Sequence, residues 1–125
     1  MPNVHDKHSP FATKFLDDFH ATVISEIQEA VKNYDVVVIG MFLNPHVYMV
    51  QKALKEANIS YHYLQYGGYF SKWKPRLAIK MWSGWPTFPQ VFVKGTLIGG
   101  NTRTRKAIKE GYIQSLLEES HSTSL

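Results

Sequence analysis

The sequence predicts an α/β fold in which helices flank a four-stranded mixed central sheet. Residues 36–39 are all β-branched and lack polar alternation, which indicates a strand buried on both faces. Segments with helical periodicity alternate with short strand-like segments over most of the chain. Two further apolar runs flank Lys94 and Gly95 and predict a closing hairpin. Two β-α units before a hairpin form a mixed sheet with helices on both sides.

The composition is that of one globular domain. The chain has 125 residues, of which 44% are hydrophobic and 19% are charged, and these values lie outside the range of disordered proteins. It contains no cysteine. Disulfide scaffolds, zinc ribbons, iron–sulfur clusters held by the chain's own thiolates and thiol nucleophiles are therefore excluded.

The N-terminal segment, residues 1–34, is expected to be a polar tail followed by a helix that packs on the domain. Ser9 supplies an N-cap, and Pro10 suits the first helical position. Apolar side chains then recur every four residues to about Lys32 and mark one face of the helix. These side chains belong to Phe15, Phe19, Val23, Ile27 and Val31.

The next elements after the first strand are a helix, a second strand and a third helix. Residues 44–57 open with an Asn-Pro pair and carry apolar side chains at helical spacing. Residues 59–66 alternate in the manner of a strand, which the following glycine pair ends. The third helix is expected over residues 70–82, with Pro75 in its first turn.

The domain itself, residues 35–118, is expected to end in one continuous helix after the hairpin. Asn101 or Thr102 supplies the side chain that caps this helix. Apolar residues at helical spacing extend it to about Leu117. Residues 119–125 are then expected to form a frayed C-terminal tail.

The most specific motif of the chain leads into the hairpin. Residues 85–95 read Trp-Pro-Thr-Phe-Pro-Gln-Val-Phe-Val-Lys-Gly, and an Ile-Gly-Gly segment follows at residues 98–100. In form and order these motifs resemble the glutaredoxins of the thioredoxin superfamily, and the monothiol branch in particular. The match covers residues 35–117. The resemblance implies a thioredoxin-like (glutaredoxin) fold with an extra N-terminal helical extension.

The family's catalytic motif is altered in this chain. In the family, a Cys-Pro-Tyr-Cys or Cys-Gly-Phe-Ser motif follows the first strand, and its first cysteine is a nucleophile of low pKa at a helix N-terminus. The matching residues here are Asn44, Pro45, His46 and Val47, and Met41 replaces the lysine usually found upstream. An amide cannot attack a disulfide. The resemblance therefore implies a pseudoenzyme with no catalytic residue and no thiol–disulfide oxidoreductase activity.

The rest of the family's glutathione cleft is present by resemblance. Its implied ligand-binding residues are Arg76, Lys80, Thr87, Phe88, Pro89, Gly99, Gly100, Asn101 and Thr102. The resemblance implies a cis peptide bond before Pro89, and it implies that Arg76 and Lys80 contact the glycyl carboxylate of the ligand. The glycine pair and the helix after it match the site of the γ-glutamyl carboxylate, where free N–H groups and the helix dipole favour an anion. The aspartate that meets the ligand's amino group in the family is missing, since Asn101 and Thr102 stand there.

The charge balance is mildly basic. Fourteen basic residues against 10 acidic ones give a net charge of +4, which favours anionic partners but is too dispersed to predict nucleic-acid binding. The basic clusters, including that at residues 103–109, are interpreted as solvated helix faces. The aromatic residues 66–74 are interpreted as anchors for a protein partner, which docks through the region of Trp73, Trp82 and Trp85.

No membrane, targeting or metal-binding segment is expected. The longest apolar run, residues 36–43, is much shorter than the roughly 20 residues that cross a bilayer. The N-terminal residues carry three aspartates and no apolar segment, so a signal peptide is not expected and a cytoplasmic location is the default. The six histidines are scattered along the chain, so no metal site is expected.

Three functions remain open. The leading hypothesis is a redox-inactive module that binds glutathione or an anionic peptide and has a regulatory part in cell redox homeostasis. The second is a glutathione-dependent enzyme in which the ligand supplies the thiol and His46 assists. The third is a structural or protein-interaction domain with an empty cleft. Under the leading hypothesis the ligand is glutathione, with no covalently bound cofactor and no iron–sulfur cluster.

Overall fold

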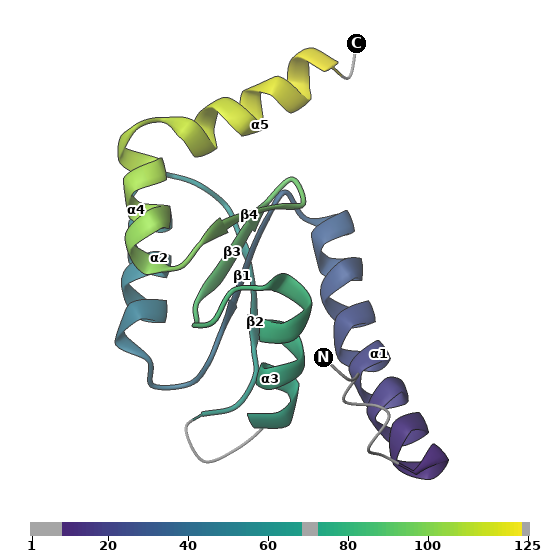
Figure 1. Cartoon of the computed structure of the whole chain (residues 1–125). Helices are drawn as coiled ribbons and strands as arrows, with labels where there is room; N and C mark the ends of the chain where they lie inside the picture. Colours follow the sequence, from purple (N-terminus) through teal and green to yellow (C-terminus); the bar gives the residue numbers. More distant parts are fainter. Residues whose placement is uncertain (1–8, 69–72, 124–125) are drawn as a thin grey trace.

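The computed structural model of the chain describes residues 9–68 and 73–123, in which helices surround one four-stranded sheet (Figure 1). In chain order the elements are α1 (Pro10–Asn33), β1 (Val36–Gly40), α2 (Pro45–Glu56), β2 (His62–Gln65), α3 (Trp73–Ser83), β3 (Gln90–Val93), β4 (Thr96–Gly99), α4 (Asn101–Lys109) and α5 (Tyr112–Thr123).

The sheet is mixed, as the sequence predicts. Its strand order is β2-β1-β3-β4. In the middle of β1, Val38 pairs in parallel with Tyr63 of β2 and antiparallel with Val91 of β3. The hairpin between β3 and β4 turns at Lys94 and Gly95, both of which have positive φ. The α/β class and the thioredoxin-like arrangement of the sheet are confirmed.

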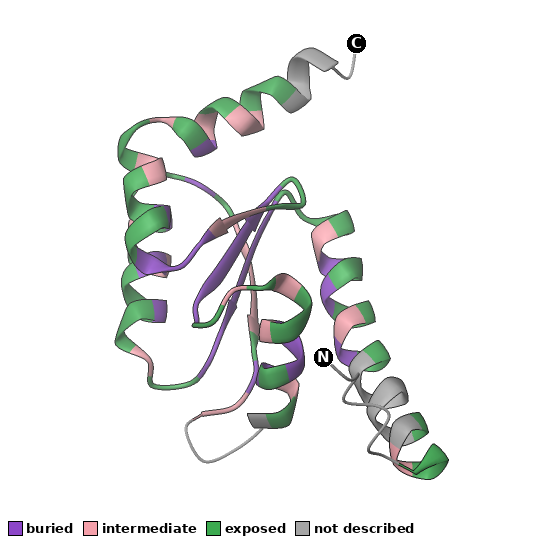
Figure 2. Cartoon of the chain, in the orientation of Figure 1, coloured by how far each residue is buried: buried purple, intermediate pink, exposed green. Residues whose placement is uncertain are grey.

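The core lies on both faces of the sheet, because all five residues of β1 are buried and its four apolar side chains alternate between two apolar clusters. Val37 and Ile39 pack with buried residues of α1 and α3. Val36 and Val38 pack with buried residues of α2 and α5. Figure 2 shows β1 and β3 as the buried centre of the molecule, with exposed residues on the outer sides of the helices.

The N-terminal helix begins where the sequence predicts. Ser9 Oγ accepts the Ala12 N–H over 3.1 Å, and Pro10 is the first helical residue. Val23, Ile27 and Ala30 of this helix join the core. Of the predicted apolar face, the side chains of Phe15 and Phe19 lie outside the described residues.

The second strand is shorter than predicted, whereas the third helix is seen only from the point where the described residues resume. The expected start of α3 at residue 70 lies outside the described residues, and α3 is seen from Trp73 with Pro75 in its first turn. Strand β2 comprises only His62–Gln65, because its register with β1 ends where Gly40 pairs with Gln65.

The prediction of one continuous C-terminal helix is wrong. Gly111 separates α4 from α5 with φ +76°, a conformation that a residue with a side chain rarely adopts. The break redirects the chain so that Ile113 packs on the sheet, and α5 crosses one end of it (Figure 1). Helix α5 then continues to Thr123, so the chain is helical over most of the segment for which the sequence predicts a frayed tail.

The predicted side-chain cap of α4 is also wrong. The N-cap is Gly100, Asn101 is the first helical residue, and no side chain bonds to the cap. The Asn101 side chain turns toward α2 instead.

None of the helices in residues 9–68 and 73–123 combines the length and the apolar composition needed to cross a membrane.

Candidate functional site

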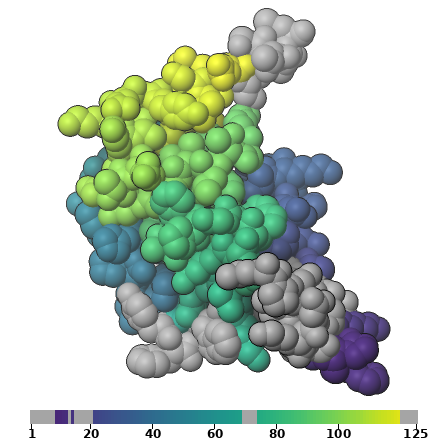
Figure 3. All heavy atoms as spheres, viewed as in Figure 1, coloured from purple at the N-terminus to yellow at the C-terminus, as the bar shows by residue number. Residues whose placement is uncertain are grey.

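Three chain segments meet at one edge of the sheet. Ile39, at the end of β1, pairs with Gln90 at the start of β3, and Val91 pairs with Gly99 at the end of β4. The segment after β1, the segment before β3 and the segment after β4 are therefore neighbours. Figure 3 shows the surfaces of α2 and α4 beside the chain that leads into β3.

A pocket of about 270 Å³ lies where these segments meet. The start of α2 contributes His46, the segment before β3 contributes three residues, and α4 and its N-cap contribute four. The complete lining is His46, Trp85, Thr87, Phe88, Gly100, Asn101, Thr102 and Arg103. Of the residues implied by the family resemblance, the structure brings together Thr87, Phe88, Gly100, Asn101 and Thr102, together with His46 of the altered motif.

Asn44, which matches the position of the family's cysteine, has a structural role as a helix cap. Its Oδ1 accepts the N–H of His46 over 2.9 Å and the N–H of Val47 over 3.2 Å. Asn44 is thus the N-cap of α2, and Pro45 takes the first helical position, where its missing N–H costs nothing. The amide stabilises the helix from the place where a thiolate would lie.

His46 and Asn101 join the starts of α2 and α4. Nδ2 of Asn101 lies 3.0 Å from Nδ1 of His46 and 3.6 Å from Sδ of Met49. In this orientation of the amide its NH₂ group donates to Nδ1, a contact that requires the tautomer with the proton on Nε2. His46 also lines the pocket.

Arg103 and Trp85 form the other wall of the pocket. Cζ of Arg103 lies 5.6 Å from the centroid of the Trp85 ring, within the range of a cation–π contact. The indole Nε1–H of Trp85 is buried and has no hydrogen-bond partner within the described residues. A Cβ at Gly100 would lie 3.3 Å from that nitrogen, so the donor lies beside the N-terminus of α4.

The electrostatics of the pocket suit an anion. The Arg103 guanidinium, the unpartnered Trp85 indole N–H and the positive end of the α4 dipole lie at this pocket, and none of its lining residues is acidic. Arg103 in the first turn of α4 adds positive charge to an end of the helix that already favours negative charge. A bound carboxylate would offset the repulsion between Arg103 and the helix dipole, and it would give the Trp85 N–H an acceptor.

Gly99 is needed for this wall to close. Its φ is +128°, and a Cβ there would lie 3.0 Å from Cδ of Arg103 and 3.2 Å from Cη2 of Trp85. Only glycine accepts that conformation without strain. Gly99 therefore allows Arg103 and Trp85 to pack closely at the pocket, but it does not line the pocket itself.

The Phe88–Pro89 peptide bond is cis, as the resemblance implies. Pro89 is buried behind the pocket, and Phe88 presents its ring to Lys80, whose Nζ lies 5.7 Å from the ring centroid. Lys80 thus lies next to a lining residue without lining the pocket itself.

Arg76 lies in the interior instead of in the cleft. It is 7% exposed, and its Nη1 donates to the backbone oxygen of Tyr66 over 2.8 Å. A buried guanidinium requires such partners, and the carbonyl after β2 provides one. The position that the resemblance implies for contact with the glycyl carboxylate therefore has a structural role here.

Of the tryptophans that the sequence assigns to a protein-docking region, Trp82 and Trp85 have different surroundings. Trp85 lines the pocket, whereas Trp82 packs against Phe92 with ring centroids 5.7 Å apart. The side chain of Trp73 lies outside the described residues.

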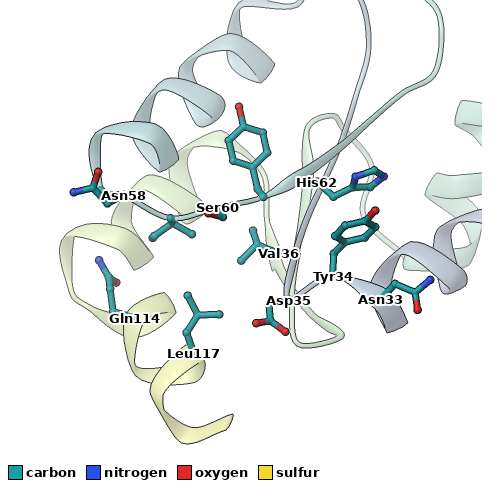
Figure 4. Close-up of a pocket in the computed structure, with 12 residues that line it drawn as sticks. Asn33, Tyr34, Asp35, Val36, Asn58, Ser60, His62, Gln114 and Leu117 are labelled. Atoms are coloured by element: carbon teal, nitrogen blue, oxygen red, sulfur yellow. The ribbon is translucent and has the colours of Figure 1, made fainter. Parts of the chain in front are cut away.

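A larger cavity, about 660 Å³, lies at the opposite end of β1 (Figure 4). There the rings of Tyr34 and His62 stack with centroids 4.0 Å apart, and the carboxylate of Asp35 binds Lys94 over 2.7 Å. The two rings thus pack on each other, and the Asp35 carboxylate is paired with Lys94. No lysine or arginine lines this cavity, so its wall has no such cation to hold an anionic ligand. Within the described residues, no group of three or more histidine, aspartate or glutamate side chains is placed to hold a metal ion.

Sequence reasoning missed Arg103 as a pocket residue and assigned Trp85 only to a protein-docking region. Arg103 was interpreted as part of a solvated basic face. The signal that could have identified it is a cation in the first turn of a helix that follows a glycine pair and has no acidic residue there.

Comparisons with known proteins place the chain among glutaredoxin-like proteins. No model of a known protein family matches it. It is 52% identical over 99 residues to a glutaredoxin-like protein of Dictyostelium discoideum, covering 79% of this chain and 80% of that one. It is 30% identical over 103 residues to the mitochondrial glutaredoxin-2 of Bos taurus, covering 78% of this chain. The chain spans only 62% of that relative's length.

Solved structures show the same fold. Oxidized glutaredoxin 2 of Chlamydomonas reinhardtii superposes with a TM-score of 0.70 at 26% identity, covering 82% of this chain and 96% of that one. A buckwheat glutaredoxin–glutathione complex superposes with a TM-score of 0.71 at 21% identity, covering 80% and 91% of the two chains.

Proposed function

Because this chain belongs to the glutaredoxin-like family, we propose that it binds glutathione, or the carboxylate of a peptide, without catalysing thiol–disulfide exchange. Its role is then that of a binding or regulatory module in cell redox homeostasis. A cytoplasmic location stays a prediction from the sequence, and the bovine relative is named as a mitochondrial protein.

The observation that carries the proposal is the donor-lined pocket at the start of α4. Arg103, the Trp85 indole N–H and the helix N-terminus all favour a carboxylate there. The buckwheat neighbour, a complex with glutathione, supports this choice of ligand.

The absence of exchange chemistry follows from the residues themselves. The chain has no cysteine, and Asn44 is engaged in capping α2. Thiol–disulfide exchange requires a thiolate that attacks a disulfide sulfur. A bound thiol ligand is therefore held, but the protein forms no mixed disulfide with it.

His46 favours a second candidate, a glutathione-dependent enzyme. Asn101 holds Nδ1 of His46, which leaves Nε2–H directed to other partners. In this tautomer the imidazole is a donor that stabilises a ligand thiolate rather than a base that removes its proton. This candidate predicts turnover that His46→Ala abolishes while the fold is retained.

Titration of the full chain with reduced glutathione, followed by amide NMR, tests the proposal. We expect saturable shifts at Gly100, Thr102 and the Trp85 indole N–H. Arg103→Ala should weaken binding by about tenfold, the usual size of one lost hydrogen bond to a charged group. Lys106→Ala removes a neighbouring exposed cation outside the pocket and serves as the control. If glutathione produces no shifts in the folded protein, the cleft is empty and the third hypothesis, a structural domain, replaces this one.

A further inference from the structure

Helices α2 and α4 pack against each other and carry the positive charge of the chain. Six basic side chains project from them, and all six are exposed. They are Lys52, Lys55, Arg103, Arg105, Lys106 and Lys109. The acidic residues nearby in sequence are Glu56, which ends α2, and Glu110, which follows α4. Six basic against two acidic residues leave +4, which is the net charge of the whole chain, so the remainder of the chain is neutral.

These six side chains have no salt bridge within residues 9–68 and 73–123. Lys94, by contrast, is bound by Asp35 at the turn between β3 and β4. Like charges gathered on two adjacent helices repel one another, so the arrangement costs stability unless a partner supplies negative charge. We refer to this surface as the α2–α4 basic face.

An apolar groove lies on the other side of α2. Its volume is about 440 Å³, and it is lined by Met41, Leu43, Asn44, Pro45, Val47, Tyr48, Gln51, Tyr63 and Gln65. Leu43 is 75% exposed and Tyr48 is 66% exposed, which is unusual for side chains of this size. Leu43 also has φ +57°, a conformation that holds it at the tip of the turn before α2.

The groove and the basic face both include residues of α2. Tyr48 lines the groove, whereas the next residue, Met49, contacts Asn101 at the start of α4. Helix α2 therefore has the apolar groove on one side and cations of the α2–α4 basic face on the other. Lys52 is one of its exposed residues. Tyrosine, methionine and arginine are the side chains that protein interfaces favour.

We propose that this surface docks an acidic, amphipathic segment of a partner protein. The segment places an apolar side chain in the groove beside Leu43 and Tyr48 and carboxylates against Arg105 and Lys109. A nucleic acid could meet the cations, but it has no aliphatic side chains to cover Leu43 and the groove, so the mixed surface favours a protein. The docking surface lies beside the glutathione cleft and shares only Arg103 with it, so it does not depend on glutathione binding.

The test uses the full chain and a fluorescent synthetic peptide of sequence Glu-Glu-Leu-Phe-Glu-Glu-Leu-Leu-Glu-Glu, followed by anisotropy. We expect binding that weakens with added salt, because exposed charges are screened. Replacing every glutamate of the peptide by glutamine should abolish binding. The double variant Arg105→Glu with Lys109→Glu should weaken it by tenfold or more, and Leu43→Ser should weaken it several-fold.

Lys32→Glu is the matched control, since it reverses one exposed cation on α1, away from this surface. An unchanged far-UV circular dichroism spectrum and an unchanged urea midpoint show that the double variant is folded. Three results overturn the proposal. The double variant could bind the peptide as the unchanged chain does. A single-stranded DNA oligonucleotide could bind with equal affinity and show the same loss. The chain could dimerise through this face in sedimentation experiments.

Discussion

The side-chain amide of Asn101 donates to Nδ1 of His46 over 3.0 Å and so joins the first turns of α2 and α4. The two residues are 55 positions apart in the chain. One belongs to the altered catalytic motif, and the other is the first residue of the helix at whose start we propose that a carboxylate binds. We expect this bond to favour the tautomer of the imidazole that carries its proton on Nε2.

Asn101→Ala should release the imidazole of His46. Without the amide donor, nothing holds the proton on Nε2, and we expect both tautomers to be populated. Long-range ¹H–¹⁵N NMR spectra of the histidine rings report the tautomer directly. Thr102→Ala changes the next residue of the helix without touching His46 and is the control. An unchanged His46 spectrum in the Asn101 variant would show that this bond does not set the tautomer.

Gly99→Ala should destabilise the fold by about 1–3 kcal/mol, the cost of forcing a side chain into a sparsely populated conformation. The new Cβ also lies 3.2 Å from both Cβ of Arg103 and Cη2 of Trp85. Gly84→Ala is the matched control, because Gly84 has φ +74° but no heavy atom within 4 Å of the added Cβ. Urea denaturation of the two variants separates backbone strain from contact. Equal losses of unfolding free energy would mean that Arg103 and Trp85 move away from the added Cβ without cost.

Tyr66 should make the free energy of unfolding depend on pH in the alkaline range. Burial, followed by the hydrogen bond of its hydroxyl to Glu26 Oε1 over 2.8 Å, raises the pKa of Tyr66 well above its usual value of 10.0. The folded state therefore keeps a proton that the unfolded state loses, and stability falls as the pH rises above 10. Tyr66→Phe should flatten this fall in urea titrations made below and above that pH. Tyr48→Phe, which removes an exposed hydroxyl, should leave the slope unchanged.

Asn44→Cys should restore activity against glutathione mixed disulfides. A sulfur at this position lies beside the N–H groups of His46 and Val47 at a helix N-terminus, which lowers the pKa of a thiol. Loss of the cap should cost about 1 kcal/mol. Val47→Cys introduces a buried thiol on the same helix and should remain inactive. A folded Asn44→Cys variant without activity would indicate that the cleft no longer positions the ligand sulfur.

Local patterns predicted most of the fold. Every side chain in residues 36–39 is β-branched, which suits only a strand covered on both faces, and the structure confirms it. The break at Gly111 could not be predicted in the same way, because the residues on either side continue one helical spacing of apolar side chains. Whether a glycine there ends a helix depends on the position of the core that Ile113 must reach.

The sequence by itself determined the sheet, the order of its strands and the loss of thiol chemistry, because periodicity and composition are properties of neighbouring residues and of the whole chain. Tertiary structure alone decided which side chains share the pocket. It buried Arg76 against the Tyr66 carbonyl, set Arg103 over Trp85 and joined Asn101 to His46. These contacts join segments that are distant in sequence, and they form only when packing of the helices on the sheet brings their ends to one edge.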